Sequence, residues 1–309
     1  MAQYTPETMT RKQLRSCYNR FFISFLLCMV LVQLTATALS AGIQLWLLKD
    51  PAHERWSAVL QVALNDISCY LPPLIVFPLL LGKLPSSPAL PKDPLDPWEL
   101  LQAVVVCMGV GYLFSLLTSY IITAIETLVG SSSQNFVSEF ETSLPFWLTV
   151  MSFAVLAPFF EEVIFRGILL HRLRGLGDTS AVLLSALAFA FFHLNLYQLA
   201  YAFVLGILFA CITLLTGSIR DTFLLHAIIN GSSVFVDHYE ALQKPFYTLV
   251  VVLILVGLLM FLRNAKHYHL EPGPLPFSKH EKRRACLRSP WFLLTVLLSL
   301  LVSVVSVFV

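Results

Sequence analysis

The stretch PFFEEVIFRGILLH, residues 158–171, decides the fold class of this chain. It lies in an apolar run at 144–170 that is long enough to span a bilayer, yet it carries Glu161, Glu162 and Arg166. Each charge in the middle of a membrane helix costs about 2.5–3.5 kcal/mol. Glu162 and Arg166 are four residues apart and can form an ion pair on a helix, whereas Glu161 projects about 100° away. An ionisable side chain at this depth marks a candidate functional site.

The overall composition is that of a polytopic membrane protein. Of the 309 residues, 57% are hydrophobic and 12% are charged, whereas a soluble domain carries about 25% charged residues. The net charge of +2 offers no basic domain for nucleic acid, which we exclude as a partner. The six cysteines contain no CxxC pair, so neither a zinc framework nor a disulfide framework is expected.

Apolar runs predict an all-α, polytopic transmembrane helix bundle of about eight to nine spans. The predicted spans lie at about 21–48, 57–82, 100–129, 145–170, 179–196, 198–216, 219–237, 245–262 and 290–309. The chain divides into a basic cytoplasmic N-terminus at 1–20, N-terminal spans within 21–144, central helices within 145–237, and C-terminal spans within 245–309 that include a basic loop at 263–289.

Lysine and arginine are distributed unevenly between the loops. With the N-terminus inside, segments 1–20, 83–99 and 263–289 face the cytoplasm, and together they hold most of the basic residues. Cytoplasmic loops carry such an excess, so we expect a multi-pass cell-membrane protein with a cytoplasmic N-terminus. The run at 21–48 is too long for a signal peptide and is expected to remain as a span. The short termini and the lack of an organelle-retention signal favour a bacterial plasma membrane.

Three further polar side chains interrupt later apolar runs: His193 in FAFFHL, and His226 and Asn230 in LLHAIINGSS. His226 and Asn230 are four residues apart and share one helix face. At a rise of 1.5 Å per residue, these three side chains and Glu161 lie about 10–20 Å from the cytoplasmic ends of their helices. All four fall in one slab of the membrane and can converge in a cavity that opens toward the cytoplasm.

Each of these residues also has a purely structural explanation. A single histidine or asparagine in a membrane helix commonly forms a hydrogen bond across helices. Glu162 and Arg166 are explained by their ion pair, and Asp66, beside Asn65, either supports a site or lines a polar interior. The shared depth of Glu161 and the three later side chains favours one common site.

This set of groups suits amide hydrolysis inside the membrane. A buried carboxylate can act as a general base toward water, and with a neighbouring histidine it can return the proton to a leaving amine. His226 and Asn230 can donate hydrogen bonds to a developing oxyanion, and one such donor is typically worth about 10²–10³ in rate. No serine or cysteine is an obvious nucleophile, which favours attack by water.

Zinc is the competing interpretation, because two histidines and a glutamate are a conventional ligand set. An HExxH motif is absent, however, and Asn230 suits an oxyanion donor better than a zinc ligand. No cofactor is firmly predicted, and a divalent metal such as zinc stays open as an alternative.

Three ordered motifs carry a family resemblance: EEVIFR (161–166) fits EExxxR, FAFFH (189–193) fits FxxxH, and HAIIN (226–230) fits HxxxN. In this order, on successive hydrophobic segments, they resemble the CPBP family of CAAX proteases and bacteriocin-processing enzymes, also called the ABI family. Its best-studied type is the Ras-converting type II CAAX endopeptidase, a glutamate-dependent intramembrane protease. The resemblance covers about 145–237, and the flanking spans match only in being hydrophobic. It implies that 145–237 are the catalytic helices and that the bundle encloses an intramembrane catalytic cavity.

The resemblance implies a role for each motif residue. Four would carry the chemistry: Glu161 as the catalytic base, His193 as its partner in activating water, and His226 and Asn230 as the oxyanion stabilisers. Glu162 and Arg166 would organise the site. None of these motif positions is substituted in this chain.

The resemblance also implies a substrate, a protein or peptide associated with the lipid bilayer. In a bacterium we expect a peptide precursor, a bacteriocin leader or a membrane-anchored regulator.

Two other classes of protein stay open as alternatives to a protease. A non-catalytic immunity or membrane scaffold protein would not require the intact Glu161, His193, His226 and Asn230. A transporter could use Asp66 and Glu161, but it would be expected to show inverted repeats, which the sequence lacks. No pattern indicates an oligomeric state.

Overall fold

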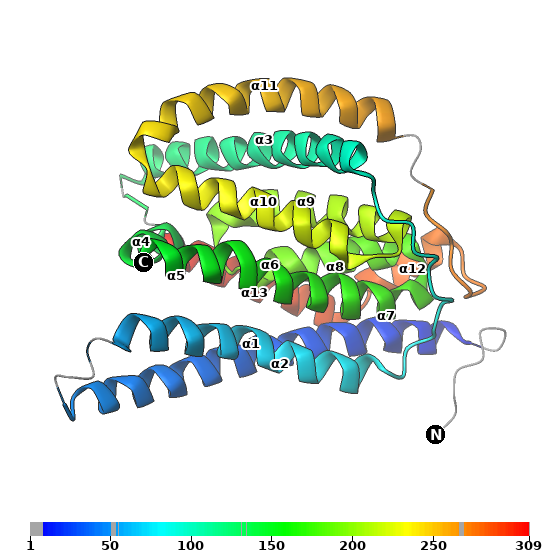
Figure 1. Cartoon of the computed structure of the whole chain (residues 1–309). Helices are drawn as coiled ribbons and strands as arrows, with labels where there is room; N and C mark the ends of the chain where they lie inside the picture. Colours follow the sequence, from blue (N-terminus) through cyan, green and yellow to red (C-terminus); the bar gives the residue numbers. More distant parts are fainter. Residues whose placement is uncertain are drawn as a thin grey trace.

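The computed structural model describes residues 9–50, 54, 56–130, 132–133, 135–265 and 269–308, and most of them lie in helices (Figure 1). No strand occurs within these ranges, so the predicted all-α fold is confirmed. The elements are α1 (Arg11–Leu47), α2 (Ser57–Leu81), α3 (Pro97–Val129), α4 (Phe136–Ser143), α5 (Phe146–Thr149), the π-helix η3 (Val150–Leu156), α6 (Ala157–Glu161), the π-helix η4 (Glu162–Leu170), α7 (His171–Leu173), the 3₁₀ turn η5 (Arg174–Leu176), α8 (Asp178–Phe192), α9 (Leu196–Thr216), α10 (Ile219–His238), α11 (Glu240–Asn264), α12 (Lys279–Leu287) and α13 (Pro290–Phe308).

Several of these helices can cross a membrane. Among the described residues six are long and apolar enough, or seven if the bent pair α12–α13 forms one span. The expected count of about eight to nine also includes the segments at 179–196 and 219–237. The first of these forms α8, an apolar helix of 15 residues, which at 1.5 Å per residue covers only about 22 Å of a hydrocarbon core about 30 Å thick. The second forms α10, which carries the polar residues of HxxxN.

The helices form layers around a central group (Figure 1). The antiparallel pair α1–α2 covers one side, the pair α3–α11 covers the other, and α5 to α10 lie between them. Glycines allow α3 and α11 to touch: a Cβ on Gly109 would lie 2.1 Å from the carbonyl oxygen of Leu253, and one on Gly257 would lie 2.5 Å from that of Val105. Small residues that let backbones approach are the usual basis of helix pairing in membranes.

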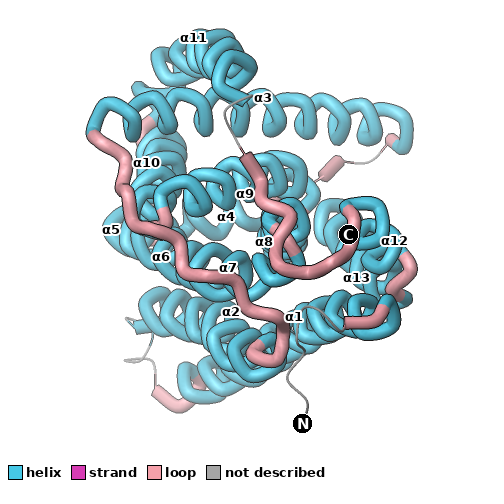
Figure 2. Tube along the Cα trace, turned by 90° about the vertical axis from the view of Figure 1, so that its right-hand side faces the viewer, coloured by secondary structure: helices cyan, strands magenta, loops and turns pink. Residues whose placement is uncertain are grey.

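Long loops cover the end of the bundle that carries α7 and α12 (Figure 2). The turn after α7 is held between two of them. Arg174 Nη1 donates to the carbonyl oxygen of Pro88 at 2.7 Å. A Cβ on Gly175 would lie 1.8 Å from the carbonyl oxygen of Pro85, and one on Gly177 would lie 2.4 Å from that of Pro272. The opposite end carries α4 and the turn between α10 and α11 (Figure 1).

Candidate active site

The helix that carries EExxxR is irregular, and Pro158 explains how it holds Asn230. Proline has no backbone N–H, so Pro158 cannot donate to the carbonyl groups of the preceding turn. The N–H of Ala157 donates to Ser152 in the π-helix η3. The carbonyl oxygen of Phe153 therefore accepts neither from Ala157, whose N–H is used by Ser152, nor from Pro158, which has no N–H. Asn230 Nδ2 donates to it instead, at 3.0 Å. π-helical turns are frequent at functional sites, and here one provides the acceptor that orients the asparagine of HxxxN.

The predicted ion pair of EExxxR is present and fully buried. Arg166 Nη1 lies 3.0 Å from Glu162 Oε1, and both side chains are at most 1% exposed. The guanidinium carbon of Arg166 also lies 4.4 Å from the ring centroid of Phe189 and 5.2 Å from that of Phe209. Aromatic ring faces attract cations. The opposite charge and the two rings together explain how this arginine is accommodated in an apolar bundle.

His226 links the two glutamates of EExxxR. Its Nδ1 lies 3.0 Å from Glu162 Oε1, and its Nε2 lies 3.6 Å from Glu161 Oε2. An ionised carboxylate only accepts hydrogen bonds, so Nδ1 carries the hydrogen in the first contact. Donation from Nε2 as well requires the doubly protonated ring. The histidine of HxxxN is therefore positioned by Glu162 and directed at Glu161.

His193 lies at the C-terminal end of α8, where the helix stops and Leu194 adopts a positive φ of 46°. Its Nδ1 lies 2.8 Å from the carbonyl oxygen of Phe189. A carbonyl oxygen only accepts, so Nδ1 is the donor, and in the neutral ring Nε2 keeps a lone pair. No hydrogen bond between His193 and Glu161 occurs among the described residues, so a water between them would have to connect the two groups.

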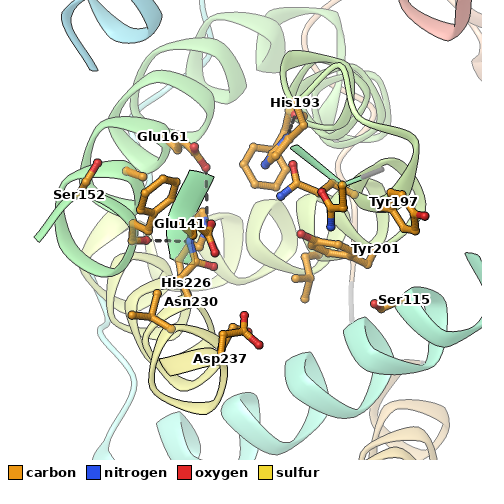
Figure 3. A pocket seen from close by; sticks show the side chains of 18 of the residues that line it. Ser115, Glu141, Ser152, Glu161, His193, Tyr197, Tyr201, His226, Asn230 and Asp237 are labelled. Carbon is orange, nitrogen blue, oxygen red and sulfur yellow. Dashed lines mark hydrogen bonds and ion pairs between the residues drawn. The ribbon is translucent and has the colours of Figure 1, made fainter. Parts of the chain in front are cut away.

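One cavity of about 370 Å³ brings the predicted catalytic side chains together (Figure 3). Four of them line it: Glu161, His193, His226 and Asn230. Glu162 and Arg166 lie behind His226 and are not among the residues that line it. A water molecule occupies about 30 Å³ in the liquid, so the space admits water together with part of a peptide. We name this space the carboxylate cavity, because Asp66, Glu141 and Asp237 also line it.

Sequence patterns did not identify two further contacts of this cavity. Tyr70 donates from its hydroxyl to Glu161 Oε1 at 3.4 Å. Ser152 donates to the carboxylate of Asp66, with both oxygens at 3.3 Å. Asp66 and Tyr70 are four residues apart on α2, and that spacing could have indicated a shared face. Ser152 had no such signal, because it lies far from Asp66 in the sequence.

The carboxylate cavity opens at the end of the bundle that lies away from the basic loops. The predicted opening toward the cytoplasm stays a prediction, because it depends on the orientation of the chain in the membrane. Its solvent-exposed lining residues, Ser119 and Asp237 among them, lie toward the end of the bundle that carries α4. The other direction is closed by the buried ion pair of EExxxR and by Leu169 and Leu170, which are at most 1% exposed. The helix depths placed the four side chains in one slab but could not show which end the packing fills.

Glu141 lies on α4, outside the helices that can span the membrane, and it faces Asp237 across the open end of the cavity (Figure 3). Burial raises the pKa of Glu141 to about 7, and the charge of Asp237 adds to the effect. This carboxyl group therefore changes charge near neutral pH, at the point where a ligand would enter.

The zinc alternative requires several ligating side chains close together. Within the described parts of the chain, no three His, Cys, Asp or Glu side chains are grouped so that they could hold a metal ion. Activation of water by side chains alone needs no such cluster.

A polar cavity with a glutamate, two histidines and an asparagine inside an apolar helical bundle places the chain among the polytopic membrane proteins that carry an intramembrane site. In a sequence comparison, residues 143–232 match the model of the Rce1-like type II CAAX prenyl endopeptidases. The match contains all three motifs and supports the assignment to the CPBP family of CAAX proteases. It likewise supports a CAAX-type intramembrane protease, a hydrolase that works in the bilayer on a membrane-associated substrate. No curated protein and no solved structure matches the chain.

Proposed function

We propose that this chain is a glutamate-dependent intramembrane endopeptidase, which hydrolyses a peptide bond of a membrane-associated protein or peptide with activated water. One observation carries the proposal: Glu161, His193, His226 and Asn230 come from three separate motifs and line a single polar cavity. A structural role for each residue alone would not require them to share one space.

In this mechanism Glu161 is the general base and His193 holds the water. His193 Nε2 accepts one hydrogen of the water, and Glu161 removes a proton from it. The oxygen of the water bonds to the carbonyl carbon of the substrate, and an electron pair moves onto the carbonyl oxygen. Glu161 then returns the proton to the amide nitrogen, the C–N bond breaks, and an amine and a carboxylic acid leave.

Asn230 and His226 stabilise the negative carbonyl oxygen of the intermediate. Asn230 uses one N–H on Phe153, and its second N–H remains for the oxyanion. His226 shares the helix face of Asn230, lines the same cavity and is the second group at the oxyanion. Preorganised donors of this kind are typically worth about 10²–10³ in rate each.

Glu162 and Arg166 act as positioning residues. Glu162 accepts from His226 and fixes the direction of the ring, while Arg166 compensates the charge of Glu162. Since neither residue lines the cavity, they act through His226 and not on the substrate.

The charge of the cavity indicates the kind of substrate. Asp66, Glu141, Glu161 and Asp237 line it, and no lysine or arginine is among its described lining residues. A ligand that carries the same charge as its binding site is repelled and binds more weakly. We propose that the residues entering the cavity are neutral or cationic and that a free carboxylate binds poorly. The matched family is described by prenylated CAAX substrates, and in a bacterium a peptide precursor, a bacteriocin leader or a membrane-anchored regulator takes that place.

We propose a cytoplasmic N-terminus, supported by the excess of basic residues in segments 1–20, 83–99 and 263–289. The carboxylate cavity then opens on the outer side. Cysteines introduced at Ser86 and Ser132, near opposite ends of the bundle, test this with a membrane-impermeant maleimide on intact cells. Labelling at Ser132 alone is expected, and labelling at Ser86 alone would reverse the orientation.

The test of function is cleavage of a fluorogenic membrane-peptide library, including a prenylated CAAX peptide, by the purified full-length chain. Glu161→Ala is the informative variant. Glu139→Gln is the matched control, because Glu139 is exposed on α4 and is not among the residues that line the cavity. Cleavage by the parent chain and the control, and its loss in Glu161→Ala, is the expected result.

The other outcomes separate the alternatives. Equal cleavage by Glu161→Ala would mean that the base is assigned wrongly. Loss of cleavage with a zinc chelator and recovery with zinc would favour the metal-dependent version. Folded protein that cleaves no peptide in the library would favour a non-catalytic immunity or scaffold protein.

A further inference from the structure

A second cavity, of about 530 Å³, lies at the end of the bundle opposite to the mouth of the carboxylate cavity. It is bounded by α8, α9 and the pair α12–α13, and we name it the basic groove. Its wall is largely apolar and includes Leu183, Leu184, Leu187, Phe203 and Phe292. Its rim is basic, with Lys279, His280, Lys282 and Arg283, and the one acidic residue among its described lining residues is Glu271.

The rim of the basic groove is fixed by specific contacts. The backbone N–H of Asp178 donates to the carbonyl oxygen of Glu271 at 3.0 Å, and the N–H of Glu271 donates to Asp178 Oδ2 at 3.2 Å. Lys282 is buried and donates from Nζ to the carbonyl oxygen of Pro272. The loop before α12 is thereby attached to the start of α8, so the groove is preformed.

Two basic side chains on the rim remain available for a ligand. Lys279 and Arg283 are exposed, and within the described residues neither forms an ion pair or a side-chain hydrogen bond. They lie four residues apart on α12 and therefore face the same way. The other described cations near this end include Arg11 and Arg174, which are paired with Glu281 and Asp178.

The position of α12 indicates what kind of ligand fits. α12 and α13 meet at an angle of 64°, and only α13 is apolar along its length. When α13 lies across the membrane, the bend turns the charged α12 toward the membrane surface, as in interfacial helices. The basic rim then lies at the level of the lipid head groups, and the apolar wall lies at the level of the acyl chains.

We propose that the basic groove binds one anionic phospholipid of the bilayer. Its phosphate lies between Lys279 and Arg283, and an acyl chain follows Leu183, Leu187 and Phe203. Basic pockets between membrane helices bind anionic head groups in this way. The proposal is independent of the protease chemistry, since no residue of the three motifs lines the groove.

The test is a lipid titration of the full-length chain after its own lipids have been removed in detergent. Native mass spectrometry measures how much lipid binds. Phosphatidylglycerol is the probe, with phosphatidylcholine and glycerol 1-phosphate as the neutral-lipid and headgroup-only arms. Lys279→Ala with Arg283→Ala removes both proposed phosphate contacts. One basic residue near an anionic lipid surface is worth about fivefold in affinity, so the pair should weaken binding by roughly 25-fold.

The matched control is Arg284→Ala with Arg288→Ala. It removes the same charge from the same helix and its C-cap, and neither residue is among those that line the groove. At most a twofold change is expected. Equal weakening by both pairs would mean diffuse attraction to the surface and would overturn the proposal. Equal affinity for phosphatidylcholine, or binding of glycerol 1-phosphate as tight as that of the lipid, would overturn it as well.

Leu187→Trp, which fills the wall, keeps the proposal testable if the double variant does not fold. It should lower the affinity for phosphatidylglycerol by at least tenfold and reduce cross-linking by a lipid with a photoreactive acyl chain. In the parent chain the cross-links should map to peptides that contain Leu183 or Phe203. Cross-links elsewhere, or unchanged binding to Leu187→Trp, would contradict the proposed position.

Discussion

The carboxylate cavity and the basic groove are two spaces in one bundle with opposite chemistry. The first lies among the central helices, is lined by Asp66, Glu141, Glu161 and Asp237, and is entered from the end that carries α4. The second lies at the other end, has an apolar wall and is bordered by Lys279 and Arg283. An anionic amphiphile therefore matches the groove, and a neutral or cationic peptide matches the cavity.

The two spaces also differ in how the chain forms them. The carboxylate cavity depends on broken backbone geometry, because Pro158 and the π-helical turns present a free carbonyl oxygen and carry paired carboxylates into the core. The basic groove depends on a bend between two regular helices and on a loop attached at Asp178. Substitutions should therefore affect chemistry and stability at the cavity, and mainly lipid binding at the groove.

The largest expected effect on stability is that of Arg166→Met. It leaves the carboxylate of Glu162 buried without its cation, which typically costs about 3–5 kcal/mol. The free energy of unfolding in detergent measures the loss, and Lys279→Met at the exposed rim should change it little. Adding Glu162→Gln should restore much of the loss. An Arg166→Met variant as stable as the parent chain would mean that the pair is not what compensates Glu162.

Asn230→Ala should have the next largest effect, on rate and not on folding. Loss of one oxyanion donor lowers kcat by about 10²–10³, and KM for the peptide should change much less. Steady-state kinetics on a peptide found in the library separates the two parameters. A rise in KM with unchanged kcat would show that Asn230 binds the ground state only.

Pro158→Ala tests whether the missing N–H positions Asn230. The new N–H can donate to the preceding turn and compete for the carbonyl oxygen of Phe153, so we expect kcat to fall by about tenfold, below the loss typical of a removed oxyanion donor. Pro245→Ala, inside α11 and away from the cavity, is the matched control. Combining Pro158→Ala with Asn230→Ala should add nothing, because both act through one contact. Additive losses of kcat would mean that Pro158 and Asn230 act independently.

The smallest effect concerns pH and substrate charge. Glu141, with a pKa of about 7, is neutral below that pH and negative above it. The groups that face it include Asp237 and His238 of α10. The ratio of kcat/KM for a lysine-containing peptide to that for its neutral analogue should rise a few-fold between pH 6 and pH 8. Glu141→Gln should flatten the rise, and a rise that persists in this variant would assign it to another group.

Local patterns predicted much of the fold and part of the site. The apolar runs indicated an all-helical membrane bundle, and the spacing of Glu162 and Arg166 indicated an ion pair that the structure contains. The shared depth of the four side chains of the three motifs indicated one cavity, and they line one. These features depend on helix period and helix length, which a sequence displays directly.

Features that depend on packing between distant segments were not predictable in this way. The acceptor of Asn230 is a backbone carbonyl that Pro158 leaves free, and no side-chain pattern displays it. The direction in which the cavity opens depends on which end is filled by Leu169, Leu170 and the loops. The basic groove likewise requires the bend between α12 and α13, whereas the sequence showed only a basic loop followed by an apolar run.

The most direct test of the central claim is the kcat of Glu161→Gln, measured beside Glu139→Gln in the same proteoliposomes. Glutamine keeps the shape of Glu161 and the contact from Tyr70 but cannot remove a proton from water. A carboxylate base that both takes and returns the proton predicts a fall in kcat of at least about 10³, with unchanged unfolding and little change in KM. A Glu161→Gln enzyme that keeps kcat within tenfold of the parent chain would contradict the assignment of Glu161 as the base.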